Sequence, residues 1–210
     1  MSGKVRLRWP CGIVFPEVTD DHIGRMCTQG DVYESSLLAD IRTRSARMAL
    51  DVGAHIGVHT IWLSSFCGFK VISLEPTPAT AAKLRANVAA NGLTDRVLVV
   101  EAAAGATPGR GRMEERSEVN TGMNRLVLDP AGPVEVITID SLEVKPALIK
   151  IDVEGEEMAV LAGAAATIER HKPLLYVEGD MKTLDLWAAA HGYRRFGRYA
   201  VTPVYGYRAR

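Results

Sequence analysis

The sequence has few cysteines and no surplus of charge of either sign. The three cysteines, Cys11, Cys27 and Cys67, are far apart and form no Cys-x-x-Cys pair, so the sequence indicates neither a disulfide framework nor a zinc site. Lysine plus arginine and aspartate plus glutamate number 25 each. This balance argues against a dedicated nucleic-acid-binding protein, which usually has an excess of positive charge.

The sequence also lacks a basic-then-apolar signal segment and any apolar run long enough to span a bilayer. We therefore expect a soluble, cytoplasmic protein that has no membrane partner. Hydrophobic residues make up 47% of the 210 residues, which argues against a disordered chain and allows one domain with a large core. We expect residues 45–210 to form this domain and residues 1–44 to form an N-terminal segment that caps one end of its sheet.

Apolar runs alternate with helical patterns from residue 48 onward. The runs lack strict polar alternation, as buried parallel strands do, and they cover 48–52, 70–74, 97–100, 148–151 and 174–177. Helical patterns cover about 57–66, 79–91, 155–170 and 181–191. This order predicts an α/β fold with a mostly parallel, doubly wound sheet, and residues 193–207 predict a final antiparallel hairpin. Residues 105–132 are rich in Gly, Arg and Glu, and we expect a loop there.

The segment from Leu50 to Gly57 predicts a ligand site. It reads as a buried strand, a glycine-rich turn and the start of a helix. At such a place an α/β protein presents backbone N–H groups to a nucleotide-like ligand. Glu75 ends the next apolar strand and follows Gly53 by 22 residues, close to the ~20 expected for a carboxylate that binds ribose hydroxyls. The sequence therefore predicts an adenosine-containing cofactor.

Asp51 bears on the type of cofactor. A dinucleotide-binding turn reads Gly-x-Gly-x-x-Gly, whereas this turn has Asp51 at the first position and a different glycine spacing. A carboxylate there would repel a pyrophosphate and would suit an ammonium or sulfonium group, both of which S-adenosylmethionine contains. The pattern favours a methyl donor over a nicotinamide dinucleotide, although Asp51 could instead cap the following helix.

Several blocks resemble the FkbM family in sequence and in order. They are DVGAHIGVHT at 51–60, EPTPATAAKLRANVAANG at 75–92 and LIKIDVEGEE at 148–157, with shorter matches at 30–34, 136–142, 161–164 and 173–178. His55 departs from the family, which usually has asparagine there. The resemblance implies a Rossmann-like, class I methyltransferase fold for 45–210. It also implies an S-adenosylmethionine-dependent enzyme that methylates a hydroxyl group of a small-molecule acceptor, a sugar or a natural product.

The resemblance further implies a cofactor site. Asp51, Gly53, Ala54 and His55 would line the methionine end, and Glu75 would hold the ribose hydroxyls beside Pro76 and Thr77. Glu101, Ala102 and Ala103 would flank the adenine, while Tyr33 and Glu34 would close the pocket from the N-terminal side.

An aliphatic hydroxyl is a weak nucleophile, so its methylation needs a proton acceptor or a metal ion. Asp152 and Glu154 follow the strand at 148–151, at the sheet edge where open α/β sheets bind ligands. We predict them as the catalytic residues, with Asp152 first. Lys150 points the same way as Asp152, so Asp152 could instead be its structural partner. Glu178 could contact the acceptor or neutralise Lys150.

Other hypotheses remain open at this stage. His55 and His59 have i, i+4 spacing, and Asp152, Glu154 and Glu178 could together hold Mg²⁺, but nothing in the sequence requires a metal. The arginines and tyrosines of the C-terminal segment leave an RNA methyltransferase as an alternative. A nicotinamide-dependent oxidoreductase and a cofactor-binding module without catalysis are the others.

Overall fold

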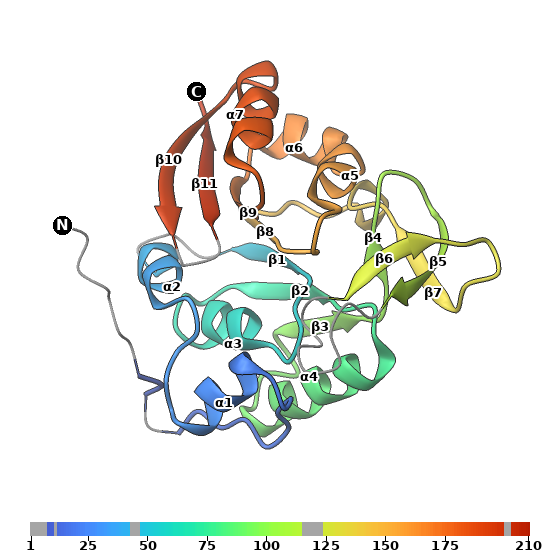
Figure 1. Ribbon diagram of the computed structural model, residues 1–210. Coiled ribbons are helices and arrows are strands. Elements are labelled where there is room, and N and C mark those ends of the chain that lie inside the picture. Colours follow the sequence, from blue (N-terminus) through green and yellow to red (C-terminus); the bar gives the residue numbers. More distant parts are fainter. Residues whose placement is uncertain (1–7, 11, 43–46, 115–123, 200–202) are drawn as a thin grey trace.

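The computed structural model describes residues 8–10, 12–42, 47–114, 124–199 and 203–210. Within these ranges the centre is a seven-stranded sheet with the order β10-β11-β9-β8-β1-β2-β3 (Figure 1). Five strands run parallel, namely β9 (Leu174–Glu178), β8 (Leu148–Ile151), β1 (Met48–Val52), β2 (Lys70–Leu74) and β3 (Val97–Val100). The strands β10 (Tyr193–Tyr199) and β11 (Val204–Ala209) form an antiparallel hairpin, and β11 pairs with β9. The predicted α/β fold with a final hairpin is confirmed.

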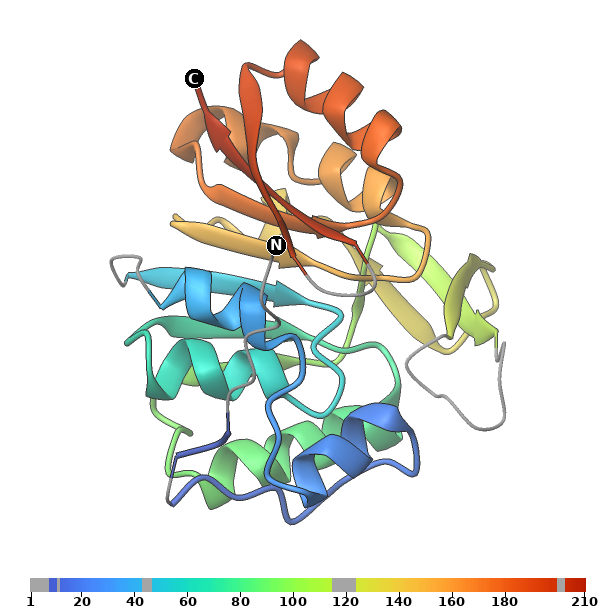
Figure 2. The same cartoon turned by 60° about the vertical axis from the view of Figure 1, so that its left-hand side comes forward.

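Helices cover both faces of this sheet (Figures 1 and 2). On one face lie α1 (His22–Thr28), α2 (Ser35–Ile41), α3 (Val58–Ser65) and α4 (Pro78–Ala90); on the other lie α5 (Glu157–Ala162), α6 (Ala165–His171) and α7 (Met181–Ala190). Successive residues of β1 pack on opposite faces of the sheet. Ala49 belongs to the apolar cluster under α3 and α4, and Leu50 belongs to the cluster under α5, α6 and α7. Burial on both sides explains why the parallel strands are continuous apolar runs.

The pattern at 155–170 predicts one helix, but the structure contains two. The break lies at Gly163, whose backbone is so close to Gly105 that an added Cβ would be 2.0 Å from the Gly105 carbonyl oxygen. Asp140 lies in a 3₁₀ turn, Asp140–Leu142, and its carboxylate accepts hydrogen bonds from the N–H groups of Ala166 (3.0 Å) and Thr167 (2.8 Å). The second helix therefore has its own cap from a distant segment, which helical periodicity does not reveal.

The prediction of a loop over 105–132 is wrong for the described part of that segment. This part contributes strands to a small second sheet. Its order is β4-β7-β5-β6, formed by Ala103–Ala104, Val134–Ile137, Gly109–Glu114 and Arg125–Leu128. This sheet lies beyond the carboxyl ends of the parallel strands (Figure 1). Residues 115–123 lie outside the described residues. Glycine and arginine have low or unremarkable strand propensity, so the pairing of β5 with β6 and β7 was not evident from local sequence.

The N-terminal segment packs against α3 rather than standing apart. Leu37, Leu38 and Ile41 of α2 are completely buried in the same cluster as Ile61 and Leu63 of α3. The predicted boundary at residue 44 falls in 43–46, outside the described residues, so the division into two parts stays a prediction. In the described ranges we find no helix with the length and apolar character needed to cross a membrane.

Replacement of Asp140 by alanine is expected to destabilise the protein. Asp140→Ala leaves two N–H groups in the first turn of α6 without their acceptor, and losing such a cap lowers the free energy of unfolding by about 1–2 kcal/mol. Urea unfolding followed by circular dichroism measures the change. The matched control is Asp95→Ala, at an exposed position after α4, which should leave the midpoint unchanged. Equal midpoints for the two variants would contradict a capping role.

Candidate active site

A cavity of about 340 Å³ opens at the carboxyl edge of the parallel strands. Its floor is formed by residues at the ends of β1, β2, β8 and β9 and by the segment after β3. His22 and Ile23 of α1 line one side, and Met113 and Leu126 of the small sheet line another. The cavity therefore lies where open α/β sheets bind ligands, with walls from the N-terminal segment and the small sheet.

The turn after β1 requires glycine at two positions. Gly53 has a φ of +78°, and an added Cβ would lie 1.8 Å from the carbonyl oxygen of Asp152. Gly57 precedes α3 with a φ of +95°, and a Cβ there would lie 2.5 Å from Leu84 Cδ1. The N–H groups of Gly53 and Ala54 both donate to the carbonyl oxygen of Leu74, at 3.0 Å each. The turn is thus fixed against the end of β2.

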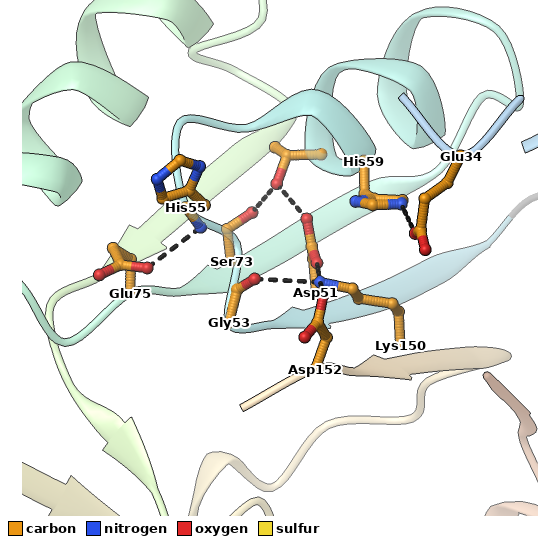
Figure 3. Close-up of polar contacts among 10 residues, drawn as sticks. Glu34, Asp51, Gly53, His55, His59, Ser73, Glu75, Lys150 and Asp152 are labelled. Atoms are coloured by element: carbon orange, nitrogen blue, oxygen red, sulfur yellow. Dashed lines mark hydrogen bonds and ion pairs between the residues drawn. The ribbon is translucent and has the colours of Figure 1, made fainter. Parts of the chain in front are cut away.

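Asp51 does not line the cavity. It is completely buried, and its Oδ2 accepts a hydrogen bond from Thr60 Oγ1 at 2.6 Å, while its Oδ1 lies 3.4 Å from Lys150 Nζ (Figure 3). The cation that Asp51 meets is therefore a lysine of this chain. The strand register explains the contact, because Asp51 faces Lys150 across the β1–β8 pair. Gly57, not Asp51, occupies the cap position of α3.

Lys150 is the buried cation beneath the cavity. Its Nζ donates to the Gly53 carbonyl oxygen at 3.0 Å and lies 3.3 Å from Asp152 Oδ2 as well as close to Asp51 (Figure 3). Burial alone lowers the pKa of Lys150, but the carboxylates of Asp152 and Asp51 outweigh it and hold the pKa above its usual range. The side chain therefore stays protonated and joins β1, β8 and the turn.

Glu75 faces the cavity with both carboxylate oxygens fixed by backbone groups. The N–H of His55 donates to Oε2 at 3.0 Å (Figure 3). The N–H of Thr77 donates to Oε1 at 2.9 Å. Burial raises the pKa of Glu75, and these two hydrogen bonds oppose the rise. A carboxylate held in this way has a fixed orientation and retains lone pairs for further donors.

His55 and His59 point to different partners. His55 precedes α3 in a left-handed conformation, and its Nε2 lies 3.4 Å from Asp21 Oδ2. His59 belongs to α3, and its Nε2 lies 2.8 Å from Glu34 Oε2 (Figure 3). Burial is the main cause that lowers the pKa of His55. In the described part of the chain no three His, Cys, Asp or Glu side chains are grouped to hold a metal ion.

Asp152, Glu154 and Glu178 all line the cavity. Asp152 directly follows β8, Glu154 lies in the following turn with a φ of +57°, and Glu178 ends β9. Glu156, which lines the same cavity, is paired with Arg125 at 2.9 Å. The acidic residues that end neighbouring strands thus gather on the β8 and β9 side, away from Glu75.

The cavity brings together ten of the fourteen residues predicted as catalytic or cofactor-binding, namely Tyr33, Gly53, His55, Glu75, Pro76, Thr77, Ala102, Ala103, Asp152 and Glu154. Four do not line it. Asp51 is buried beneath it, and Ala54 and Glu34 are buried beside it, the latter with His59. Glu101 lies outside, half-exposed, and pairs with Arg85 at 2.9 Å.

Sequence reasoning missed the walls of the cavity. His22 and Ile23 belong to a helix that was not predicted, and Met113 and Leu126 belong to strands that were expected to be loop. One weak signal was available, because β7 alternates apolar and polar residues over 134–137 and only one face of it is buried.

Solved structures share this fold. Methyltransferase FkbM from Methylobacillus flagellatus KT aligns with a TM-score of 0.61 and 22% identity, over 79% of this chain and 44% of that one. The chain thus spans less than half of that protein's length. Sp1610 from Streptococcus pneumoniae in complex with S-adenosyl-L-methionine aligns with a TM-score of 0.54 and 14% identity, over 84% and 72% of the two chains.

Precorrin-6y C5,15-methyltransferase from Geobacter metallireducens GS-15 aligns with a TM-score of 0.51 and 14% identity, over 84% of this chain and 88% of that one. At these identities the likeness establishes a Rossmann-like methyltransferase fold and no more. No curated protein matches the sequence. The family model of the methyltransferase FkbM domain matches residues 51–195, which include Gly53, Glu75, Asp152 and Glu178 of the cavity. The chain therefore belongs to the FkbM methyltransferase family.

Proposed function

We propose that the cavity binds S-adenosylmethionine and that the protein transfers its methyl group to a hydroxyl oxygen of a small acceptor, a sugar or a natural product. The observation that carries this proposal is the fixed Glu75 carboxylate at one end of a cavity whose other end is lined by Asp152 and Glu154. Family membership supports methyl transfer, and the acidic residues support a cationic cofactor.

The residues present fit this cofactor. Glu75 would accept hydrogen bonds from the two ribose hydroxyls, since each of its oxygens keeps acceptor capacity. Leu74, Ala102 and Ala103 would contact the adenine with apolar atoms. The Gly53 turn would allow close approach of the methionine end. When bound, S-adenosylmethionine supplies an electrophilic methyl group on a positively charged sulfur.

Asp152 is the residue that we assign to the acceptor hydroxyl, with Glu154 as the second choice. Lys150 holds the Asp152 carboxylate at 3.3 Å and favours its ionised form, so that it can accept a hydrogen bond from the hydroxyl and orient it. The contact with Lys150 serves both of the roles considered for Asp152, because a structural partner can also be an oriented acceptor.

The charge of the cavity supports a small, neutral or cationic acceptor. Among the described residues that line it, five are acidic (Glu75, Asp152, Glu154, Glu156, Glu178) and none is lysine or arginine. A phosphodiester backbone or a dinucleotide pyrophosphate would be repelled by this lining. The observation argues against the RNA-methyltransferase and nicotinamide alternatives.

Thermal unfolding with S-adenosylhomocysteine tests the cofactor. At about 100 times its dissociation constant a ligand adds ~2.7 kcal/mol, which for a chain of this size raises the midpoint by roughly 5–10 °C. We expect this shift with S-adenosylhomocysteine and none with NAD or NADP. A shift with NAD or NADP alone would replace the proposal with a nicotinamide-dependent enzyme.

Glu75→Gln is expected to weaken S-adenosylhomocysteine binding roughly 10- to 100-fold, because a charge-assisted hydrogen bond contributes about 1.5–3 kcal/mol. Isothermal titration calorimetry measures the affinity. Glu101→Gln is the matched control, since it removes the same charge from a half-exposed residue outside the cavity, and it should bind as the wild type does. Undiminished affinity in Glu75→Gln would show that Glu75 does not hold the ribose.

A further inference from the structure

Asp152 and Glu178 are neighbours at the ends of two paired strands. Ile151 faces Val177 in the parallel β8–β9 register, so Asp152 and Glu178 take the next facing positions. Their side chains lie close enough to hydrogen-bond to one another, and both line the cavity. Two carboxylates offer only acceptors and repel each other, so this contact favours one proton in the pair.

The surroundings decide where that proton lies. Lys150 is 3.3 Å from Asp152, and Lys150 together with Glu178 and the nearby His59 lowers the pKa of Asp152 in spite of burial. Among the residues that the structure describes, no Lys or Arg pairs with Glu178 as Lys150 does with Asp152. Burial, followed by Asp152 and the carboxylates of Glu34 and Glu154, raises the pKa of Glu178 to about 9. Asp51 also lies close to Lys150, at 3.4 Å, and Glu34 lies 2.8 Å from His59 Nε2. These surroundings favour Glu178 over Asp152 as the protonated partner.

The pair lies on the side of the cavity away from Glu75. With the ribose at Glu75 after β2 and the adenine towards Ala102 after β3, the rest of the cofactor would lie towards β1 and β8. Neighbouring strands are about 4.8 Å apart, so β8 and β9 lie roughly 10 and 14 Å from β2. Asp152 and Glu178 would thus be within reach of a charged group at the methionine end and of the acceptor.

We propose that the Asp152–Glu178 pair is the proton store of the reaction: it loses its proton when the cationic cofactor binds and regains one from the acceptor hydroxyl on methyl transfer. This inference rests on the proposed function. In the transfer the carbon–sulfur bond breaks, a carbon–oxygen bond forms, and the sulfur keeps the electron pair and becomes neutral. The oxygen–hydrogen bond of the acceptor breaks, and its proton goes to the pair, which no longer has the sulfonium charge beside it.

The test compares the affinities of S-adenosylmethionine and S-adenosylhomocysteine, which differ by the methyl group and its positive charge. If binding of S-adenosylmethionine releases one proton and binding of S-adenosylhomocysteine releases none, the affinity for the first relative to the second rises with pH. The rise is up to tenfold per pH unit below pH 9. Calorimetric titrations at pH 6.5, 7.5 and 8.5 give the ratio of the two Kd values. In Glu178→Gln, which has no proton to release, we expect a ratio that does not change with pH.

Two further variants separate this effect from a general change of charge. Glu156→Gln removes another carboxylate of the cavity but keeps the pair, so the ratio should still rise with pH. Asp152→Asn removes the carboxylate that, after burial, most raises the pKa of Glu178, so the ratio should stop rising at a lower pH than in the wild type. This variant keeps the proposal testable if Glu178→Gln fails to fold. A pH-independent ratio in the wild type, or a rise that persists in Glu178→Gln, would overturn the proton store while leaving the cofactor assignment intact. Failure of both ligands to bind would overturn the proposed function and this inference together.

Discussion

The site depends on one buried ammonium group. Burying an isolated charge is very unfavourable, and Lys150 is stable in the interior only because Asp51, Asp152 and the Gly53 carbonyl oxygen surround it. The dependence is mutual, since without the lysine two carboxylates would remain close together with no cation between them. Such a cluster contributes little net stability over an apolar one, but it allows few alternative arrangements of the strands that contribute to it.

From Lys150 the contacts continue in both directions along the sheet edge. Asp51 accepts a hydrogen bond from the hydroxyl of Thr60 in α3, and this hydroxyl lies 2.7 Å from Ser73 Oγ on β2. On the other side Asp152 meets Glu178 on β9. Four neighbouring strands are thereby linked through polar side chains directly below the cavity, and the charges that face the cavity are set partly by residues that do not line it.

The sequence predicted the parts that depend on local spacing. Glycine spacing and the distance to Glu75 predicted the turn and its acid. Strand alternation predicted that Lys150 and Asp152 point the same way, which left their contact as one of the alternatives. The contact of Lys150 with Asp51 depends on a strand register between residues about a hundred positions apart, which no local pattern encodes. Glu101 illustrates the same limit: it lies next to Ala102 in the sequence, yet it points to Arg85 while Ala102 lines the cavity. The cavity walls from α1 and the small sheet also come from long-range packing.

The polar contacts of His55 with Asp21 and of His59 with Glu34 join the N-terminal segment to the turn and to α3. The family match begins at residue 51, after that segment. A fragment cut at the limits of the match would expose the apolar face that α2 covers and would lack one wall of the cavity. The region that the family model matches is therefore smaller than the set of residues that closes the core and the cavity of this chain.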